Sequence, residues 1–599
     1  MTRSLTRYVP QSRWFSAICL GFACLVSTLC AALPAQAADQ SPGSIIPGKS
    51  WAAIVFRNPG ELNEKISKLT NELQIPAPDV ISQIKLTTGA HNGVDESRAI
   101  VLCIYPNEPV PAPIALIPVS KYADFLDNYS EVEDADGHKK VTFPFGSALV
   151  ALRGDYAVIT SPDYKDAFEA FLKDSSTSEE SLRSQAAWGS KYDVLVIGFQ
   201  PGIQKAMEGI ISGLQQLKGV LANAPNAQMA TGVFDIYEKV FTVLKDEAQL
   251  SIIGVQLDEE SNLLTDTRTF FKEAGSVAKF LGHPTAPMAK GLKHLPAMPF
   301  VVAGEMSASP EAVNDYSQLT GELLPKIFNA VPADGKVDPA KLQALVDAAK
   351  KSNENMLGGA FVMGQAGPGE GLYDGTLAIL ATKDAPKSLL AYEEMYAAMN
   401  ELFKSAPKPF AFEPKRTTIN DRPALTLNMP LEAIMASTGQ AAAGPEAEKI
   451  NEMLRRWLLG GNDSITITML AIDDQTIVLS YNEALLRDFI KDYGKTPNPL
   501  AAESDVEATL KLLPAKRHGV FLLSLGGYVN LITSLMREAM AAQGNGQIMP
   551  QIPDFPAAPP VGLTISTSGN LLETNSVVLI DLMTATSSYV QGILQNRAF

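Results

Sequence analysis

The stretch GSIIPGKS, residues 43–50, matches G-x-x-x-x-G-K-[ST], the pattern of a phosphate-binding loop. Such a loop binds phosphate because a strand ends in it and a helix begins directly after it, so that backbone N–H groups converge on the anion. Here the residues that follow are WAAIVF, which predict a strand, and Pro47 removes one backbone donor. We therefore predict a linker over residues 38–50 and no nucleotide or other cofactor.

The acidic stretch EVEDADGHKK, residues 131–140, imitates the centre of a calcium loop with Asp134, Asp136 and Gly137. The twelfth position of that loop, where a bidentate Glu belongs, is Phe143. The stretch therefore predicts a solvated hairpin tip and no metal site.

Two other stretches match parts of known motifs. Ser276 and Lys279 fit the S-x-x-K of penicillin-recognising enzymes, but the companion motifs S-D-N and K-T-G are missing. The glycine-rich stretch GQAGPGEGLYDG, residues 364–375, follows one strand and precedes another, which predicts a hairpin loop rather than a dinucleotide cradle. Catalytic residues therefore stay unknown at this level.

Histidine, tryptophan and proline add no further motif. The five histidines have no metal-ligand spacing. Trp51, Trp188 and Trp457 are far apart and predict packing residues rather than a platform for stacking sugars. The Pro-rich tract IMPQIPDFPAAPP, residues 548–560, predicts a stiff surface connection between a helix and a strand, with partner docking as an alternative.

Residues 1–37 predict an export signal, with arginines, an apolar run and the cleavage site Ala35-Gln36-Ala37. Cleavage after Ala37 is expected because Pro34 breaks the apolar helix. An uncleaved membrane anchor is the alternative, since residues 14–33 are long enough to span a bilayer. Lipid attachment at Cys24 or Cys30 is a third possibility. We expect a periplasmic or extracellular protein with no membrane span after cleavage.

The chain of 599 residues has a formal net charge of −16, which becomes more negative when the basic leader is removed. Such a charge repels nucleic acid and anionic lipid headgroups. Outside the leader the only cysteine is Cys103, in the apolar run AIVLCIYP, where a strand should bury it. One cysteine cannot form an internal disulfide, so the fold depends on packing.

The order of predicted elements is the same in two parts of the chain. Each part begins with a strand–helix unit, at Trp51 or Pro299, followed by two hairpin–helix units, a second strand–helix unit and a closing hairpin–helix unit. This order predicts an α+β fold of antiparallel sheets with packed helices and an internal duplication.

The predicted duplication also sets the domain boundaries. The two halves are residues 51–285 and 299–599, with a linker or crossover at 286–298 and an insertion near 405–460 in the second half. Whether the halves are separate domains or share one sheet stays open, and so does the oligomeric state.

The segment FGSALVALRGDYAVITSP, within residues 98–175, carries Gly146, Gly154 and Tyr156 before a predicted helix. It resembles a recurring element of large exported α+β proteins of unknown function from planctomycete-type bacteria. The resemblance implies export and a repeated α+β fold. It implies no catalytic residue.

Three function classes follow. The first is an exported, non-catalytic binding or scaffold protein of the cell envelope, whose partner is an envelope protein. The second is a carrier of an apolar ligand held between sheet and helices, although the apolar helices near residues 212–224 and 233–244 are expected to fill the core. The third is an enzyme whose active site is not contiguous in sequence.

Overall fold

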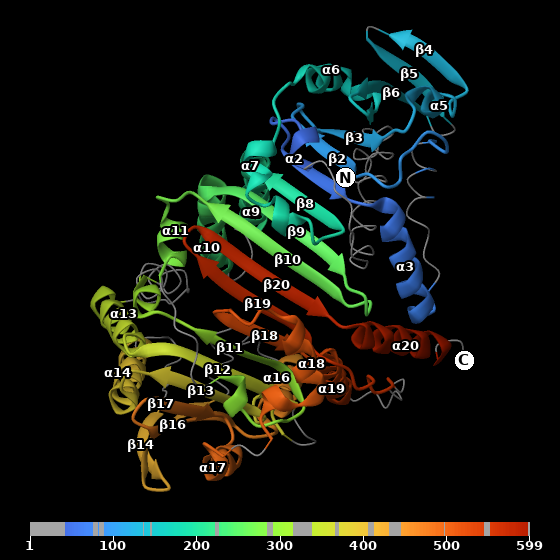
Figure 1. Ribbon diagram of the computed structural model, residues 1–599. Helices are drawn as coiled ribbons and strands as arrows, with labels where there is room; N and C mark the ends of the chain where they lie inside the picture. The colour runs from blue at the N-terminus through green and yellow to red at the C-terminus, as the bar shows by residue number, and fades with distance from the viewer. Residues whose placement is uncertain are drawn as a thin grey trace. The chain divides into compact units, whose positions relative to one another are not determined.

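The structure is a computed structural model that divides into two compact units. It describes residues 42–75, 82, 85, 89–135, 137–143, 146–221, 227–283, 291–315, 321, 338–365, 370–404, 413–430, 445–495, 498–543 and 552–596. Unit 1 comprises Met1–Ile203, Gln249–Thr269 and Val577–Thr584, and unit 2 comprises Gln204–Ala248, Phe270–Ser576 and Ala585–Phe599. Each unit is described by itself below, with labels as in Figure 1.

Unit 1 is built on an antiparallel sheet. Its strands are β1 (Ala52–Phe56), β2 (Ile100–Tyr105), β3 (Ala112–Pro118), β4 (Glu131–Ala135), β5 (His138–Phe143), β6 (Gly146–Arg153), β7 (Tyr156–Thr160), β8 (Val194–Phe199), β9 (Ala248–Leu257) and β10 (Leu263–Phe271). Neighbouring strands follow the order β4-β5-β6-β7-β3-β2-β1-β8-β9-β10. The predicted strand at WAAIVF is confirmed as β1, and the predicted hairpin β2–β3 is confirmed as well.

Helices cover this sheet through apolar stripes. They are α2 (Pro42–Ile45), α3 (Pro59–Leu73), α5 (Tyr122–Leu126), α6 (Lys165–Lys173), α7 (Glu179–Arg183) and α8 (Ala186–Gly189). The Asn58 side chain caps α3 by accepting a hydrogen bond from the Glu61 N–H (3.2 Å), and Pro59 occupies the first turn. Leu62, Ile66 and Leu69 are buried, as the predicted helix face requires.

The described part of unit 2 contains ten further antiparallel strands. Its strands are β11 (Phe300–Ser307), β12 (Met356–Gly364), β13 (Thr376–Thr382), β14 (Glu413–Ile419), β15 (Arg422–Pro430), β16 (Ser464–Asp473), β17 (Thr476–Ser480), β18 (Gly519–Leu523), β19 (Val561–Ser568) and β20 (Leu571–Val578). Neighbouring strands follow the order β14-β15-β16-β17-β13-β12-β11-β18-β19-β20.

The helices of unit 2 include two that pack on one another over the sheet. Its helices are α11 (Ser276–Leu281), α13 (Pro339–Asn353), α14 (Ala385–Phe403), α16 (Pro445–Leu459), α17 (Glu483–Asp492), α18 (Ser504–Leu512) and α19 (Leu525–Gln543). α14 contacts the strands from β13 to β17, α13 packs on α14, and α16 packs on α19. The helix α20 (Ile580–Asn596) begins in unit 1 and ends in unit 2.

The predicted α+β class with antiparallel sheets is confirmed. Adding ten to each strand number of unit 1 gives the strand order of unit 2, which is the order that an internal duplication requires. The duplication itself stays a prediction, because a shared strand order does not establish a common origin.

The compact units differ from the predicted halves 51–285 and 299–599. The segment Gln204–Ala248 and the start of Phe270–Ser576 belong to unit 2, and Val577–Thr584 belongs to unit 1. Sequence order alone cannot predict this exchange, because it depends on which distant side chains meet. Of the predicted linker or crossover at 286–298, residues 286–290 lie outside the described residues, and residues 291–298 are described.

The predicted insertion near 405–460 includes β14, β15 and α16, while its residues 405–412 and 431–444 lie outside the described residues. β14 and β15 occupy the same places in the strand order as β4 and β5 do, so they are not extra strands. Among the described residues the additional element is α16, because β5 and β6 are neighbours in the chain while α16 separates β15 from β16.

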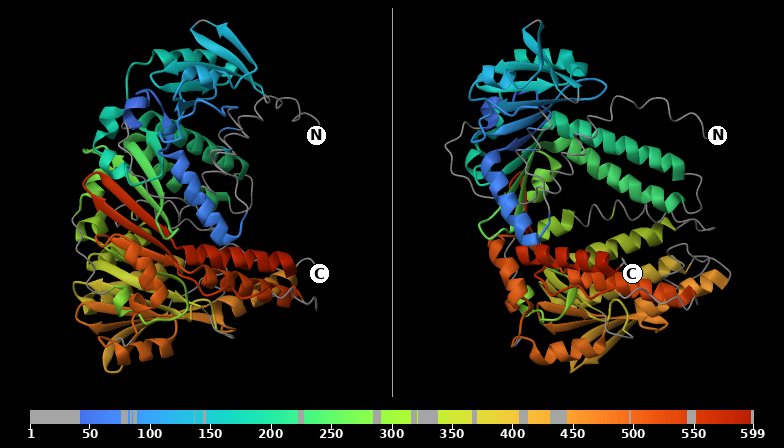
Figure 2. Two further views of the ribbon diagram at one scale, coloured as in Figure 1. Left: turned by 45° about the vertical axis from the view of Figure 1, so that its right-hand side comes forward. Right: turned by 90° about the vertical axis from the view of Figure 1, so that its right-hand side faces the viewer.

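The long helices α9 (Gln200–Leu221) and α10 (Ala227–Glu247) lie side by side (Figure 2). Lys218 joins them through Asp235 and through Glu238, whose carboxylate is 3.2 Å from the Lys218 ammonium. None of the described side chains of α9 is buried, and Val220 is 75% exposed. The expectation that these apolar helices fill the core is therefore wrong for α9, because a helix in a two-helix hairpin leaves most of its surface uncovered.

Candidate functional site

The helix α19 approaches the sheet of unit 2 at its first turn. Ser524 caps the helix, since its Oγ accepts a hydrogen bond from the Gly527 N–H (3.1 Å). A Cβ atom on Gly527 would lie 2.0 Å from the Phe300 carbonyl oxygen, so only glycine permits this approach. This close contact between the start of α19 and β11 is called here the joint of unit 2. It fixes which face of α19 lies along the end of β11.

The helix α16 ends close to α19. Gly460 and Gly461 adopt positive φ angles of 59° and 87° and stop the helix, as glycine does at many helix ends. The β12–β13 loop is attached to this end, because the Leu372 N–H donates to the Trp457 carbonyl (3.0 Å). Gly371 permits the contact, since a Cβ there would lie 2.5 Å from the Leu458 carbonyl oxygen.

These elements enclose a cavity of about 500 Å³, called here the α16–α19 cavity. Its volume is typical of small-molecule sites. It is lined by Val301, Gly364, Gln365, Glu370, Leu372, Arg456, Trp457, Gly460, Gly461, Gly527, Asn530, Leu531, Thr533, Ser534, Arg537, Glu538, Ile552, Pro553 and Asp554. Every one of these residues belongs to unit 2.

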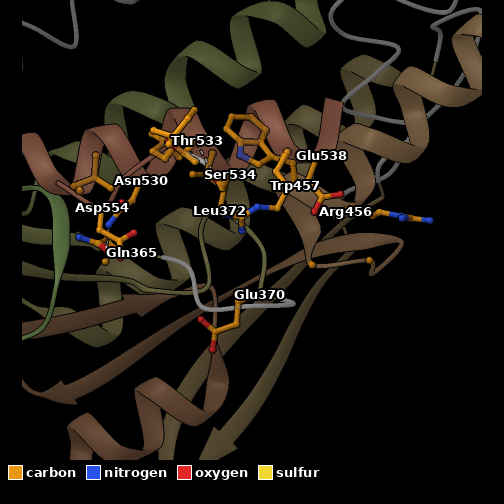
Figure 3. Close-up of a pocket in the computed structure, with 18 of the residues that line it drawn as sticks. Gln365, Glu370, Leu372, Arg456, Trp457, Asn530, Thr533, Ser534, Glu538 and Asp554 are labelled. Atoms are coloured by element: carbon orange, nitrogen blue, oxygen red, sulfur yellow. Dashed lines mark hydrogen bonds between the residues drawn. The ribbon is translucent and has the colours of Figure 1, made fainter. Parts of the chain in front are cut away.

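Figure 3 shows two groups of polar side chains along α19. Asn530, Gln365 and Asp554 lie together at one end, and the Asn530 amide donates to Gln365 Oε1 at 3.0 Å. Ser534 and Trp457 lie together further along the helix, where the Ser534 hydroxyl also donates to the backbone of its own helix. The cavity therefore presents amides, hydroxyls, a carboxylate and one indole ring.

The charged groups of the lining are partly neutralised. Arg456 points away from the other labelled residues, and its Nε lies 2.9 Å from a Glu452 carboxylate oxygen one turn earlier on α16 (Figure 3). The hydrogen bond from Arg456 holds the pKa of Glu452 below its usual range. Glu370 also points away from the labelled groups on α19. Arg537, Glu538 and Asp554 are the remaining charged residues of the lining.

A second cavity of about 400 Å³ adjoins the first at the start of α19 and is called here the α18–α19 cavity. It shares Gln365, Gly527 and Asn530 with the first. The Pro-rich connection lines both, through Ile552–Asp554 and through Phe555–Ala558 with Pro560. The predicted connection between a helix and a strand is confirmed, since this tract joins α19 to β19.

A buried ion pair in unit 1 is a second candidate. Lys65 Nζ lies 3.4 Å from Asp193 Oδ1 and 3.8 Å from Glu61 Oε1, and the Lys65 and Asp193 side chains are 1% and 6% exposed. Burial raises the pKa of Asp193 and lowers that of Lys65. Because Asp193 Oδ2 also accepts from the Leu257 N–H (3.2 Å), the buried pair has a structural role at the end of β9.

The GSIIPGKS segment is part of the folded unit 1 rather than a free linker. Ile46 is fully buried, Pro47 forms a β-bridge with Thr177, and the Gly48 N–H donates to the Ser176 carbonyl (3.2 Å). The two isoleucines explain the difference, since burial of apolar side chains favours a docked segment. Gly48 leads into β1 rather than into a helix, so the geometry of a phosphate-binding loop does not form.

The other sequence matches fall into structural positions. Asp134 and Lys139 pair across the β4–β5 hairpin, as expected of a hairpin tip, while Asp136 lies outside the described residues. Ser276 donates to Glu247 Oε1 at 2.7 Å, at the start of the short helix α11. In the part of the chain that the structure describes, no three His, Cys, Asp or Glu side chains are grouped to hold a metal ion.

The tryptophans differ from one another. Trp188 packs on Tyr192 with 4.4 Å between ring centroids, which confirms the packing interpretation for this residue. Trp457 instead lines the α16–α19 cavity, so packing alone does not describe it. Cys103 is buried and free, as predicted.

Sequence reasoning missed the site itself. The glycine-rich stretch 364–375 is the predicted hairpin loop between β12 and β13, but it also supplies Gln365 and Leu372 to the cavity. A usable signal was present, because α16, with Trp457 near its end, belongs to the stretch that the second half has in excess of the first.

No protein-family model, curated protein or solved structure matches this chain. Among the described helices, none is both long and apolar enough to cross a membrane. Residues 1–41 lie outside the description, so the export signal and the resemblance to planctomycete-type proteins stay predictions.

Proposed function

We propose that this chain is an exported, non-catalytic binding protein of the bacterial cell envelope and that the α16–α19 cavity is its binding site. The observation that carries the proposal is where the cavity lies. Both units have the same strand order, and the cavity forms among elements of unit 2 that this strand order does not require. These elements are α16, the long β12–β13 loop and the Pro-rich connection. Elements added around one cavity are typical of a site placed on a scaffold.

The polar lining supports a ligand that forms hydrogen bonds over an apolar one. An apolar ligand would remove Asn530, Thr533 and Asp554 from water without giving them new partners, and each such loss costs about 1–3 kcal/mol. A carrier of apolar ligands is the second candidate, favoured by the exposed apolar side chains of α9 and α10, among them Leu217 and Tyr237.

The test is native mass spectrometry of the full chain purified from its own host. We expect a bound small molecule in the wild-type protein and its loss in Thr533→Trp, because the larger side chain would fill the cavity. Met536→Trp is the matched control, since Met536 is 46% exposed on the same helix and does not line the cavity. Protein without a bound molecule, or a molecule retained in Thr533→Trp, would contradict the proposal. The same spectrum checks export, since the cleaved chain begins at Ala38.

A further inference from the structure

We infer that the ligand of the α16–α19 cavity is a neutral, linear oligosaccharide. This inference rests on the proposed binding function and adds the chemical class of the ligand. Four features of the described residues support it: the indole of Trp457, the polar groups around it, their balance of charge and the length of the combined cavity.

The aromatic side chain is the first feature. Trp457 stands in the last turn of α16, is partly buried, and lies beside Ser534 of α19 (Figure 3). Indole offers a flat apolar face and a polar N–H, so it can stack on the C–H face of a pyranose ring while its edge stays hydrated. The backbone fixes it, because the Leu372 N–H donates to the Trp457 carbonyl.

The polar groups are the second feature. Side-chain amides donate and accept hydrogen bonds at once, as sugar hydroxyls do, and the cavity holds Gln365 and Asn530 as such a pair. Glu538 and Asp554 offer acceptors, and within the described part of the chain neither forms an ion pair. A ligand rich in hydroxyl groups satisfies both kinds of group.

The charge balance is the third feature. Arg456 is paired with Glu452, so the other charged residues of the lining are one cation, Arg537, and the carboxylates of Glu370, Glu538 and Asp554. An anionic ligand such as a phosphate ester would meet an excess of carboxylates in a protein whose net charge is −16. A neutral ligand avoids this repulsion.

The length is the fourth feature. The two cavities meet at Gln365, Gly527 and Asn530, and their volumes are about 500 Å³ and about 400 Å³. Together they follow α19 from Gly526 to Glu538 and are lined also by the Pro-rich connection. A linear chain of sugar rings can occupy both, whereas a single ring would leave one of them empty.

The experiment is isothermal titration calorimetry of the full chain with neutral oligosaccharides, from disaccharide to hexasaccharide, of β-1,4-glucose, α-1,4-glucose and β-1,4-N-acetylglucosamine. We expect one series to bind, with affinity that rises with chain length. Trp457→Ala should lose about tenfold or more in affinity, while Trp457→Phe keeps most of it. Asn530→Leu should remove the gain from chain length, because Asn530 lies where the two cavities meet. Met536→Ala is the control expected to bind as the wild type.

The outcomes separate the inference from the proposed function. If no saccharide binds, but palmitate displaces a fluorescent apolar probe from the wild type and not from Thr533→Trp, the ligand class is wrong and the site stands. If saccharides bind equally well to Trp457→Ala, Asn530→Leu and the wild type, the assignment to this cavity is wrong. Cleavage of a bound saccharide, seen by chromatography, would contradict the non-catalytic function and support the ligand class. A cavity empty in host protein and unresponsive to all probes overturns both.

Discussion

Units 1 and 2 have the same strand order and different helices. In both, an equivalent backbone hydrogen bond joins the central strand, β1 or β11, to its neighbour, β8 or β18. The Phe199 N–H donates to the Trp51 carbonyl at 3.0 Å, and the Ser524 N–H donates to the Val301 carbonyl at 2.9 Å. The helix that follows needs a glycine at the same place, Gly202 or Gly527, whose Cβ would lie about 2 Å from a backbone oxygen.

The resemblance extends to the residue before the joined strand. The Asp193 N–H donates to Val255 and its carboxylate accepts from the Leu257 N–H, two residues on. The His518 N–H donates to Ile565 and its Nδ1 accepts from the Thr567 N–H (3.0 Å), again two residues on. The same backbone geometry is therefore held by a carboxylate in one unit and an imidazole in the other.

The difference between the units indicates which parts of the fold can carry a binding site. Strand order and joints are shared by both units, so we infer that they are needed to form the sheet. The cavities lie among helices and loops in which unit 2 departs from unit 1, where change does not disturb the sheet. The comparison predicts that substitutions at the joints affect both units similarly, except where a buried charge is present in only one.

The largest effect is expected at that charge. Asp193→Ala leaves Lys65 buried without its main partner, which should lower the free energy of unfolding of unit 1 by about 3–5 kcal/mol. The measurement is urea unfolding, followed by intrinsic fluorescence. His518→Ala is the matched control and should cost less, since it removes no buried ion pair. The double variant Lys65→Met with Asp193→Leu should recover most of the stability; if it is as unstable as Asp193→Ala, the lost hydrogen bond to Leu257 rather than the unpaired ammonium is responsible.

Much of the fold could be predicted because its signals are local. The apolar strands of both sheets and the capped helix α3 follow from alternation, helical spacing and turn residues. The strand β14 was missed, because Pro414, Lys415 and Arg416 hide the alternation. Charge and proline are typical of a strand at the edge of a sheet, which β14 is, so the same residues that protect the edge conceal the strand.

The candidate site could not be predicted because its residues are distant in sequence. Gln365, Trp457 and Asn530 come from a loop and two helices, and no spacing rule connects them. Their meeting depends on tertiary contacts, such as that of Gly371 with the end of α16. Buried partners such as Lys65 and Asp193 were missed for the same reason, since a lysine on a helix usually predicts an exposed side chain.

A smaller effect is expected at the two joints, and it tests their equivalence. Gly202→Ala and Gly527→Ala should each destabilise by about 1–3 kcal/mol, because the new methyl group overlaps a backbone carbonyl. Gly209→Ala and Gly213→Ala on α9 are the controls, with no atom within 4 Å of the added Cβ. They should be neutral or stabilising by up to about 1 kcal/mol, since alanine favours helix. Thermal unfolding measures all four. An effect at one joint and none at the other would break the equivalence.

The smallest effect concerns pH and follows from the imidazole in unit 2. Burial lowers the pKa of His518, and its Nδ1 accepts from the Thr567 N–H, which a protonated ring could not do. The folded unit therefore binds this proton less readily than the unfolded chain. Stability from His518 is complete above the unfolded pKa of about 6.5 and is lost as the pH falls through that value toward the lower folded one. The loss is small because the ring is only partly buried and solvent screens it.

His518→Asn tests this assignment, because asparagine offers an acceptor to the Thr567 N–H and does not titrate. The urea concentration at the unfolding midpoint of the wild type should decrease as the pH is lowered from about 8 to about 5.5. The variant should show a smaller decrease. Unit 1 has no imidazole at the equivalent place, since the Asp193 carboxylate accepts from the Leu257 N–H there and is paired with Lys65. Protonation of the His518 ring therefore weakens the joint of unit 2 and has no counterpart at the joint of unit 1. If His518→Asn and the wild type share one pH profile, proton uptake occurs elsewhere and the two joints do not differ in this way.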